Sequence, residues 1–203
     1  MAVRSIDEHP AGLTWVIDEP VARTSHALVH DGRVWLIDPV DEPEAIARVA
    51  ALGEPVAVLQ LLDRHGRDCA ALAARLGVPH ERVPTVLTGA PFHVVPVFSN
   101  RAWREVALWW VATGTLVVAE AIGTSAGFVP GPAGAGVHIG LRLTPPRRLG
   151  AYEPQHLLVG HGPALHGPTA SVALGEALDR SRRDLPRALA MVPKMLVAVV
   201  RGG

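Results

Sequence analysis

The chain has 203 residues, 49% of them hydrophobic, which is enough to bury a sizeable core within one domain. We therefore predict a single domain over residues 1–203. Because 19 basic and 19 acidic residues cancel, no global field would gather a polyanion, and we expect neither nucleic acid nor a membrane among the partners.

The cysteine content and the first residues indicate a compartment. Cys69 is the single cysteine, so it cannot form an internal disulfide, and residues 1–8 lack the apolar stretch of a signal peptide. The longest apolar run, 106–122, is broken by turn residues and by Glu120, which predicts two buried strands rather than a membrane span. Arginine, alanine, glycine and proline are abundant and Lys194 is the single lysine, so we expect a bacterial, cytoplasmic protein.

The first part of the chain predicts an antiparallel meander followed by a helix. Three short apolar segments are expected to be strands: 13–17, 26–30 and 33–37. Asp31-Gly32, between the last two, is a strong hairpin signal. Residues 42–52 place apolar side chains at helical spacing before Gly53, which predicts a short amphipathic helix with a glycine cap.

A buried strand and a polar turn come next. Residues 55–62 form a nearly unbroken apolar run, as expected of a strand that is covered on both faces. The polar turn 63–69 then leads into a short helix over 70–76. Charged side chains are thus expected in the turn between this strand and the following helix.

The middle of the chain predicts further strands and a long loop. The strands are expected at 92–98, 105–112 and 116–119. The last of them delivers Glu120 at its end. Residues 123–136 are rich in glycine, proline and alanine without periodicity, so we expect a long loop there.

The C-terminal part predicts one more strand and two helices. Residues 157–159 form a short strand that ends in Gly160-His161-Gly162-Pro163. Helical spacing follows over 169–183, and Pro186 begins a final helix that includes Leu196. Because that last stretch is apolar, we expect it to pack against a second copy of the chain in a homodimer.

Three polar sites share one placement in this order of elements. The turn at 63–69, Glu120 and His161 each lie just beyond an apolar strand, where the edge of a sheet opens and loop residues converge on a ligand. Carboxylate oxygen and imidazole nitrogen suit zinc, iron or manganese. The glycines on both sides of His161 permit a tight turn that presents its ring.

This order of elements resembles the metallo-β-lactamase superfamily. The resemblance covers roughly residues 24–178 and rests on Ile37-Asp38-Pro39, the polar turn before a helix, Glu120, and the Gly160-His161-Gly162-Pro163 turn. It implies an α/β fold of the four-layer αββα sandwich type and a metal-dependent hydrolase. The substrate implied is an ester, an amide or a phosphoester, that is, a small molecule.

The polar turn departs from that superfamily's His-x-His-x-Asp-His motif, and its alignment is open. In the register that we favour, His65 is the second histidine of the motif and Asp63 stands in place of the first. Arg67 then replaces the aspartate and Asp68 the last histidine. In a second register Asp68 and Cys69 are the Asp-His pair. A third register makes His65 the last histidine.

Two further departures concern the rest of the motif set. The family's additional histidine, expected in the stretch 98–105, is absent, and Glu120 stands where the family has an aspartate. The resemblance therefore implies a single metal ion rather than two. The implied zinc, iron or manganese ligands are Asp63, His65, Glu120 and His161. Asp68 is the implied catalytic general base, or a further ligand.

Two other interpretations stay open. In the first, the chain is a metal-free descendant without catalytic activity that binds a small anionic ligand or a protein partner, because Arg64 or Arg67 can replace a lost cation electrostatically. The polar turn is then a salt-linked helix cap. In the second, the chain is an unrelated α/β binding module, which would require the strands before Asp63 and His161 not to be neighbours.

Overall fold

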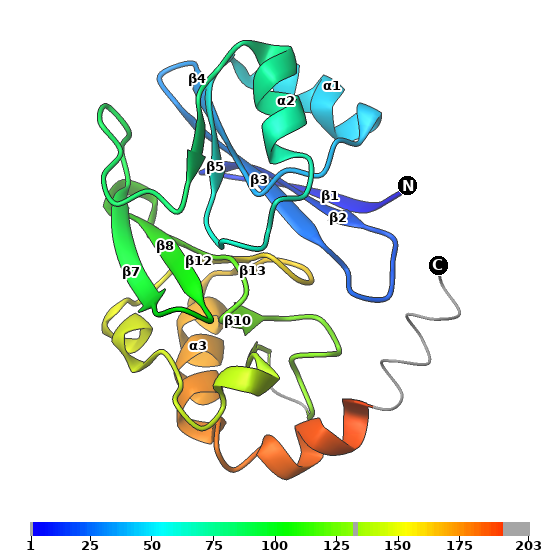
Figure 1. Cartoon of the computed structure of the whole chain (residues 1–203), viewed down its shortest axis with the longest axis vertical. Coiled ribbons are helices and arrows are strands. Elements are labelled where there is room, and N and C mark those ends of the chain that lie inside the picture. The colour runs from blue at the N-terminus through cyan, green and yellow to red at the C-terminus, as the bar shows by residue number, and fades with distance from the viewer. Residues whose placement is uncertain (1, 132–133, 193–203) are drawn as a thin grey trace.

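The computed structural model describes residues 2–131 and 134–192 and shows two facing β-sheets with helices on their outer sides (Figure 1). The strands are β1 (Val3–His9), β2 (Gly12–Ile17), β3 (Thr24–His30), β4 (Arg33–Ile37), β5 (Glu54–Gln60), β6 (His80–Arg82), β7 (His93–Ser99), β8 (Arg104–Trp110), β9 (Thr115–Val118), β10 (Ile122–Gly123), β11 (Gly136–Val137), β12 (His156–Val159) and β13 (Leu165–His166). The helices are α1 (Pro43–Leu52), α2 (Cys69–Leu76) and α3 (Pro168–Arg180), with 3₁₀ turns η1 (Val111–Thr113), η2 (Ile139–Leu141) and η3 (Arg147–Ala151).

The first sheet has the strand order β1-β2-β3-β4-β5-β6. Its first four strands pair antiparallel, and the β3–β4 turn holds Asp31 and Gly32 at φ 49° and 71°. Strands β2, β3 and β4 are the predicted meander, whereas β1 was not predicted. Helix α1 then crosses over, so β5 runs parallel to β4. The chain leaves α1 at Gly53, where a Cβ would lie 2.1 Å from the carbonyl oxygen of Gly32, so a side chain is excluded there.

The second sheet has the order β13-β12-β9-β8-β7, with β12 parallel to β9. Its strands were all predicted except the two-residue β13. The predicted long loop is closed at its base by the short β10–β11 pair, in which Gly123 faces Gly136. Both β9 and β12 therefore end at the same edge of the sheet and deliver Glu120 and His161 side by side.

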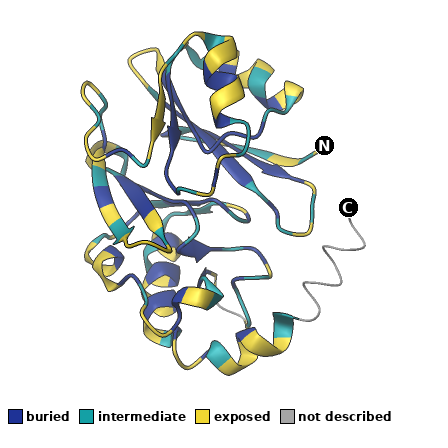
Figure 2. Ribbon diagram, viewed as in Figure 1, coloured by how far each residue is buried: buried dark blue, intermediate teal, exposed yellow. Residues whose placement is uncertain are grey.

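The apolar residues divide into three clusters, which define four layers. Leu157 and Val159 of β12 pack with α3, whereas Leu158 faces the first sheet, as expected of a strand covered on both faces. The outer cluster of the first sheet includes Val49 of α1 and Leu72 of α2. Figure 2 shows buried sheets under helices whose outer sides are exposed. The α/β fold class and the αββα sandwich are confirmed.

The C-terminal prediction is tested only in part. Residues 185–192 are helical, which agrees with a helix beginning near Pro186. Leu196, and the apolar stretch on which the expected homodimer depends, lie outside the described residues. No helix among the described residues is both long and apolar enough to cross a bilayer.

A cluster of imidazoles joins the edges of the two sheets. His9 ends β1, His156 begins β12 and His166 lies in β13, with ring centroids 4.9 to 6.1 Å apart. The Nδ1 atoms of His156 and His166 are 2.7 Å apart, and Nε2 of His166 lies 2.7 Å from the Asp7 carboxylate. These contacts connect the first strand of one sheet to the last two strands of the other.

Further contacts lead inward from His9. Its Nε2 lies 3.0 Å from the hydroxyl of Thr14, which lies 2.8 Å from Nδ1 of the buried His26. Burial, together with the neighbouring imidazole of His166, lowers the pKa of His9 to about 4. Burial also holds the pKa of His26 well below its usual range. Both rings are therefore neutral in the folded protein near pH 7.

We predict that acid destabilises the fold through these histidines. The unfolded chain protonates His9 below its ordinary pKa of 6.5, whereas the folded protein does so only near pH 4. The free energy of unfolding therefore falls as the pH drops from 6.5 towards 4. At pH 5 the contribution of His9 is about 1–2 kcal/mol, discounted for its partial exposure. Denaturant unfolding at pH 7 and pH 5 measures this loss.

The matched variants separate His9 from other titrating groups. His9→Gln keeps an amide at the Nε2 position for Thr14 and should reduce the loss of stability on acidification by that amount. His30→Gln, exposed at the end of β3, controls for the removal of one imidazole. An equal pH dependence in the wild type and His9→Gln would contradict the prediction.

Candidate metal centre

The ends of strands from both sheets meet at one edge of the sandwich. Here the ligand atoms of His65, Glu120 and His161 lie within 4.8 Å of one another, and in residues 2–131 and 134–192 this is the one histidine, cysteine and carboxylate group that meets this criterion. Three of the four predicted ligands are thus brought together. They come from the turn after β5, the end of β9 and the end of β12.

The turn that carries His161 requires both of its glycines. A Cβ on Gly160 would lie 2.0 Å from the carbonyl oxygen of Ala119, and one on Gly162, at φ 97°, would lie 2.4 Å from the amide nitrogen of Ser125. The backbone can therefore pass between β9 and the following loop only without side chains. The ring of Phe128 stacks on that of His161 with centroids 5.6 Å apart. The imidazole is thereby held in one orientation.

Hydrogen bonds on the outer side fix the tautomers of both histidines. Nδ1 of His161 lies 2.9 Å from the carbonyl oxygen of Val21, which can only accept, so Nδ1 carries the proton. Nδ1 of His65 donates in the same way to the Asp38 carboxylate at 3.0 Å. In both neutral rings the lone pair then lies on Nε2, and Nε2 of His65 faces Glu120 at 3.5 Å. This is the arrangement of metal-ligating histidines.

Asp38 was part of the sequence resemblance but was not predicted to be a site residue. It is buried and adopts a left-handed backbone conformation at φ 43°, which is costly for a residue other than glycine. Its second oxygen accepts from the backbone amide of Leu61 at 3.0 Å. The carboxylate thus ties His65 to the end of β5. A polar residue after the apolar end of β4 was the available signal.

The pKa values show how strongly the three groups interact. Burial alone would raise the pKa of Glu120, but the contact with His65 and the fields of His138 and His161 lower it to about 2. Burial, with Arg67 and His65, lowers the pKa of His161 to about 4. Burial and Arg67 act to lower the pKa of His65, yet its hydrogen bonds to Asp38 and Glu120 raise it overall. A proton and a metal ion would therefore compete for Nε2 of His65.

Arg67 connects the loops around the site. Its guanidinium donates to the carbonyl oxygens of Thr24 at 2.5 Å, Asp38 at 2.7 Å and Gly160 at 2.9 Å. Burial lowers the pKa of Arg67, but arginine remains charged at any accessible pH. Its own backbone is left-handed at φ 39°. A fixed positive charge therefore stands beside the candidate ligands.

His138 lies beside the site. Its Nε2 lies 3.5 Å from Glu120, and its ring packs against those of Trp103 and Phe128. Nδ1 accepts from the amide of Gly140 at 3.2 Å, so the proton of the neutral ring is on Nε2. His138 thus presents a donor, the opposite of His65 and His161.

Asp63 and Asp68 do not belong to the three-residue group. The Asp68 carboxylate accepts from the amide of Asp41 at 2.9 Å. Oδ1 of Asp63 is buried without a hydrogen-bond partner among the described residues. The role of Asp63 as a ligand and that of Asp68 as general base remain predictions. The register that makes Cys69 a ligand is disfavoured, because its thiol donates to the carbonyl of His65 and burial raises its pKa to about 12.

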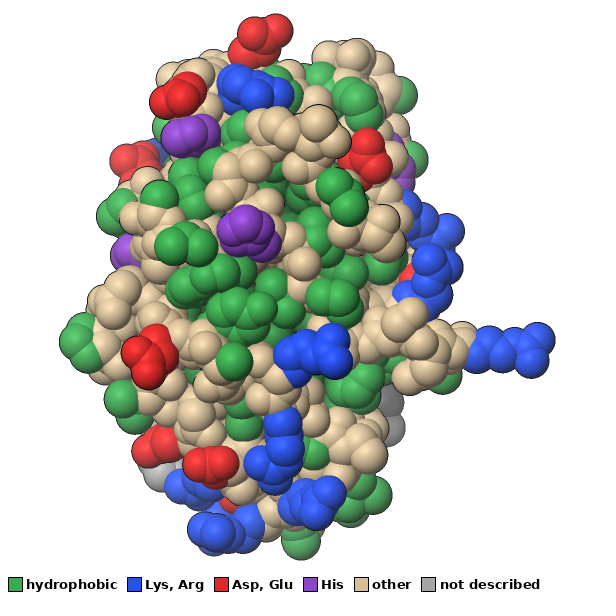
Figure 3. Space-filling model, turned by 90° about the vertical axis from the view of Figure 1, so that its left-hand side faces the viewer, with side chains coloured by type: hydrophobic (Ala, Val, Ile, Leu, Met, Phe, Trp, Pro, Cys, Tyr) green, Lys and Arg blue, Asp and Glu red, His purple; other side chains and the backbone are tan. Residues whose placement is uncertain are grey.

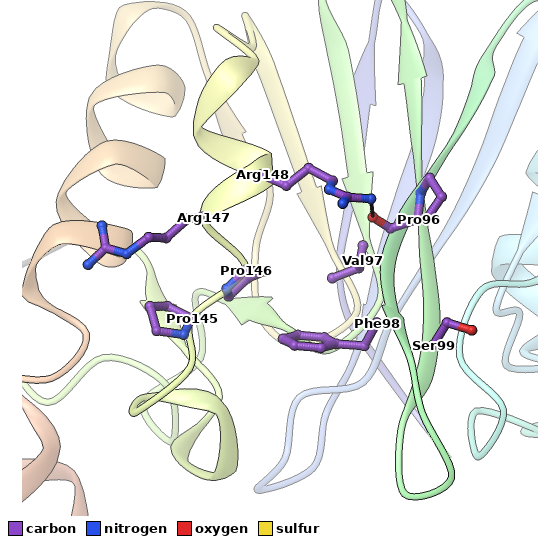
Figure 4. A pocket seen from close by; sticks show the side chains of 8 residues that line it. All are labelled: Pro96, Val97, Phe98, Ser99, Pro145, Pro146, Arg147 and Arg148. Atoms are coloured by element: carbon purple, nitrogen blue, oxygen red, sulfur yellow. Dashed lines mark hydrogen bonds between the residues drawn. The ribbon is translucent and has the colours of Figure 1, made fainter.

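A hollow of about 380 Å³ lies elsewhere, between β7 and the segment that leads into η3. In Figure 4, Pro96 to Ser99 of β7 face Pro145 to Arg148, and Arg148 reaches the carbonyl oxygen of Pro96 at 3.5 Å. Figure 3, which views the molecule from the side of β7, shows hydrophobic side chains gathered in the middle with basic ones below. None of the candidate ligands lines this hollow.

We predict that Arg67→Met lowers the free energy of unfolding by about 3 kcal/mol, because buried carbonyl groups lose a charged donor. Denaturant unfolding measures the change. Arg48→Met is the control: Arg48 is half exposed on α1 and its ion pair among the described residues is with Glu8, so its loss should cost about 0.5 kcal/mol or less. Equal stability of the two variants would contradict the role assigned to Arg67.

No protein-family model matches the chain, and no curated protein matches it. Solved structures do match. A metallo-β-lactamase from Erythrobacter litoralis has a TM-score of 0.60 at 11% identity, with 90% of this chain and 95% of that chain covered. DIM-1 metallo-β-lactamase, exposed to ceftazidime, gives 0.59 at 11%, covering 89% and 98%. BLEG-1 B3 metallo-β-lactamase gives 0.52 at 15%, covering 77% and 99%.

These matches also decide between the fold interpretations left open. The strands before Asp63 and His161 are β5 and β12, which lie in different sheets although their ends meet at one edge. Their positions alone therefore do not distinguish the metallo-β-lactamase fold from an unrelated α/β binding module. The matched structures do distinguish them, because they cover most of this chain and nearly all of their own. At such low identity the similarity concerns the fold. The protein has the metallo-β-lactamase fold.

Proposed function

We propose that the protein is a hydrolase that works with one divalent metal ion, zinc, iron or manganese, held by His65, Glu120 and His161. The observation that carries the proposal is the convergence of their ligand atoms within 4.8 Å. The outer nitrogen of each histidine is engaged by an acceptor, which leaves Nε2 available. Two imidazoles and one carboxylate suit a catalytic site that keeps a coordination position open.

The chemistry expected of the site is the hydrolysis of an ester, an amide or a phosphoester in a small molecule. His65, Glu120 and His161 would hold a divalent ion, which would supply Lewis acidity and a source of hydroxide near neutral pH. The chain's own residues orient the reaction. Asp38 holds His65 in its ligating tautomer, Phe128 shields one face of His161, and His138 offers its Nε2 proton to a substrate oxygen.

A single metal ion is supported by Arg67. The guanidinium occupies the space between the ends of β3, β4 and β12, where its three carbonyl partners converge. A second divalent cation nearby would meet this fixed positive charge at short range. Lack of the family's histidine at 98–105 and the longer Glu120 side chain agree with a site that holds one ion.

A metal-free binding protein is the second candidate function. The observation that favours it is that the charges of the site are already partnered: Asp38 and Glu120 both contact His65, and together they raise its pKa. A protonated His65 would then fill the electrostatic role of the metal. Metal ions should stabilise the hydrolase against heat, whereas a metal-free protein should respond mainly to small anions or a protein partner.

The compartment and the kind of partner remain proposals. A reducing cytoplasm is supported by Cys69, which is buried and has a thiol pKa raised to about 12, so it is poorly suited to form an external disulfide. The neutral net charge supports a small molecule rather than nucleic acid as the partner.

We predict one equivalent of zinc, iron or manganese per chain after purification without a histidine tag, measured by elemental analysis. His65→Ala, His161→Ala and Glu120→Gln should each lower metal affinity by roughly a hundredfold or more, because each removes one of three protein ligands. His93→Ala, exposed on β7, is the control for the loss of a histidine. Failure of the wild type to retain any of these ions after their addition would refute the hydrolase.

The same measurement tests the remaining sequence-based assignments. If the three convergent residues are the complete protein ligand set, Asp63→Asn and Asp68→Asn keep one equivalent of metal. Loss of metal in Asp63→Asn would instead make Asp63 a fourth ligand. A variant Asp68→Asn that binds metal normally but loses activity over the whole pH range would support its role as general base.

We predict that Asp38→Asn weakens metal binding by about 10-fold to 100-fold. The amide of Leu61 must face the carbonyl oxygen of the new side chain, so its NH₂ group faces Nδ1 of His65. Nδ1 must then accept, and the proton moves to the ligating Nε2. Competition with a chelator measures the affinity, and Asp41→Asn, whose carboxylate pairs with Arg75 at the surface, is the control. Equal affinity of the two variants would contradict the tautomer argument.

A further inference from the structure

Two arginines of one turn have opposite surroundings. The guanidinium of Arg67 donates hydrogen bonds to three backbone carbonyls. The guanidinium of Arg64, in contrast, has no hydrogen bond to any residue in the described part of the chain, and its side chain is 47% exposed. Its nearest carboxylate oxygen belongs to Glu120, at 3.8 Å. Arg64 therefore offers its donors to a ligand at the rim of the candidate metal centre.

The Arg64 side chain is nevertheless held in place. Its guanidinium carbon lies 4.1 Å from the centre of the Trp103 ring, a cation–π contact. Trp103 in turn donates from Nε1 to the buried carboxylate of Glu105 at 2.6 Å. Glu105 also accepts from the backbone amides of Glu120 and Ala121. One buried carboxylate thus positions both the platform under Arg64 and the backbone of a metal ligand.

A second donor lies beside the same carboxylate. Nε2 of His138 is 3.5 Å from Oε1 of Glu120, whereas Arg64 lies on the side of Oε2. The His138 ring packs against Trp103 with centroids 5.0 Å apart. Because the amide of Gly140 occupies Nδ1, the N–H of the neutral ring faces the site. Two positioned donors therefore flank the carboxylate that completes the metal ligand group.

We propose that Arg64, supported by His138, binds an oxyanion of the substrate, so that the site accepts small molecules that carry a carboxylate or a phosphate. This inference rests on the proposed hydrolase only in that it calls the bound molecule a substrate. The binding of the anion itself does not require a metal ion. A planar guanidinium with free donors suits both anions, because each presents two oxygens to its fork. Its fixed position reduces the entropy lost when the anion binds.

The test is anion binding by full-length protein, with and without added zinc, followed by calorimetry and by the midpoint of thermal unfolding. The probes are inorganic phosphate and acetate, compared with chloride at equal ionic strength. Wild type should bind one or both oxyanions, and whichever binds more tightly identifies the class. Arg64→Met, which keeps an apolar stem on Trp103, should weaken this binding roughly tenfold or more. Arg64→Lys should fall between them, since it keeps the charge but not the fork.

Controls separate this proposal from the metal site. Arg48→Met removes an equally exposed arginine on α1 and should bind both anions as the wild type does. Arg64→Met should keep the metal content of the wild type, whereas His161→Ala should lose metal. If Arg64→Met binds phosphate and acetate as tightly as the wild type, or if the wild type binds neither, the proposal is overturned. Arg64-dependent binding by a protein that retains no metal would uphold it while refuting the hydrolase.

Discussion

A single guanidinium, that of Arg67, joins the strand ends on which the candidate ligands depend. Its carbonyl partners belong to Thr24, Asp38 and Gly160, so it links the first sheet to the turn that carries His161. Because arginine is charged at any accessible pH, this connection does not dissociate as a metal ion does. The loops that carry the candidate ligands are therefore held together by the chain itself. A cation is needed only beside Glu120, between the two ligating histidines.

Hydrogen bonds outside the site assign different chemistry to identical side chains. An acceptor on Nδ1 makes Nε2 of His65 and of His161 a ligand atom, whereas a donor on Nδ1 makes Nε2 of His138 a proton carrier. The imidazole type alone does not distinguish these roles. What distinguishes them is the backbone geometry that brings a carboxylate, a carbonyl or an amide to the outer nitrogen. The role of each histidine is thus a consequence of the fold around it.

The sequence predicted most of the fold because local patterns dictate most of it. Asp31-Gly32 specifies a hairpin, and the glycines around His161 mark a passage that excludes side chains. The ligand set was predicted only in part, since convergence depends on which strand ends meet. Asp38 acts through a left-handed backbone that no local pattern indicates. His138 follows the long loop, so its place beside Glu120 depends on how that loop folds back rather than on a local pattern.

The charges around the ligand atoms connect the number of metal ions to the kind of substrate. Asp38 and Glu120 carry two negative charges and Arg67 one positive charge, so one negative charge remains to be balanced. A proton on His65 balances this charge. One divalent ion also balances it and leaves one positive charge in excess. Two divalent ions would leave an excess of three positive charges among these groups. One ion together with the exposed Arg64 leaves a modest excess, and a substrate oxyanion is what would neutralise it.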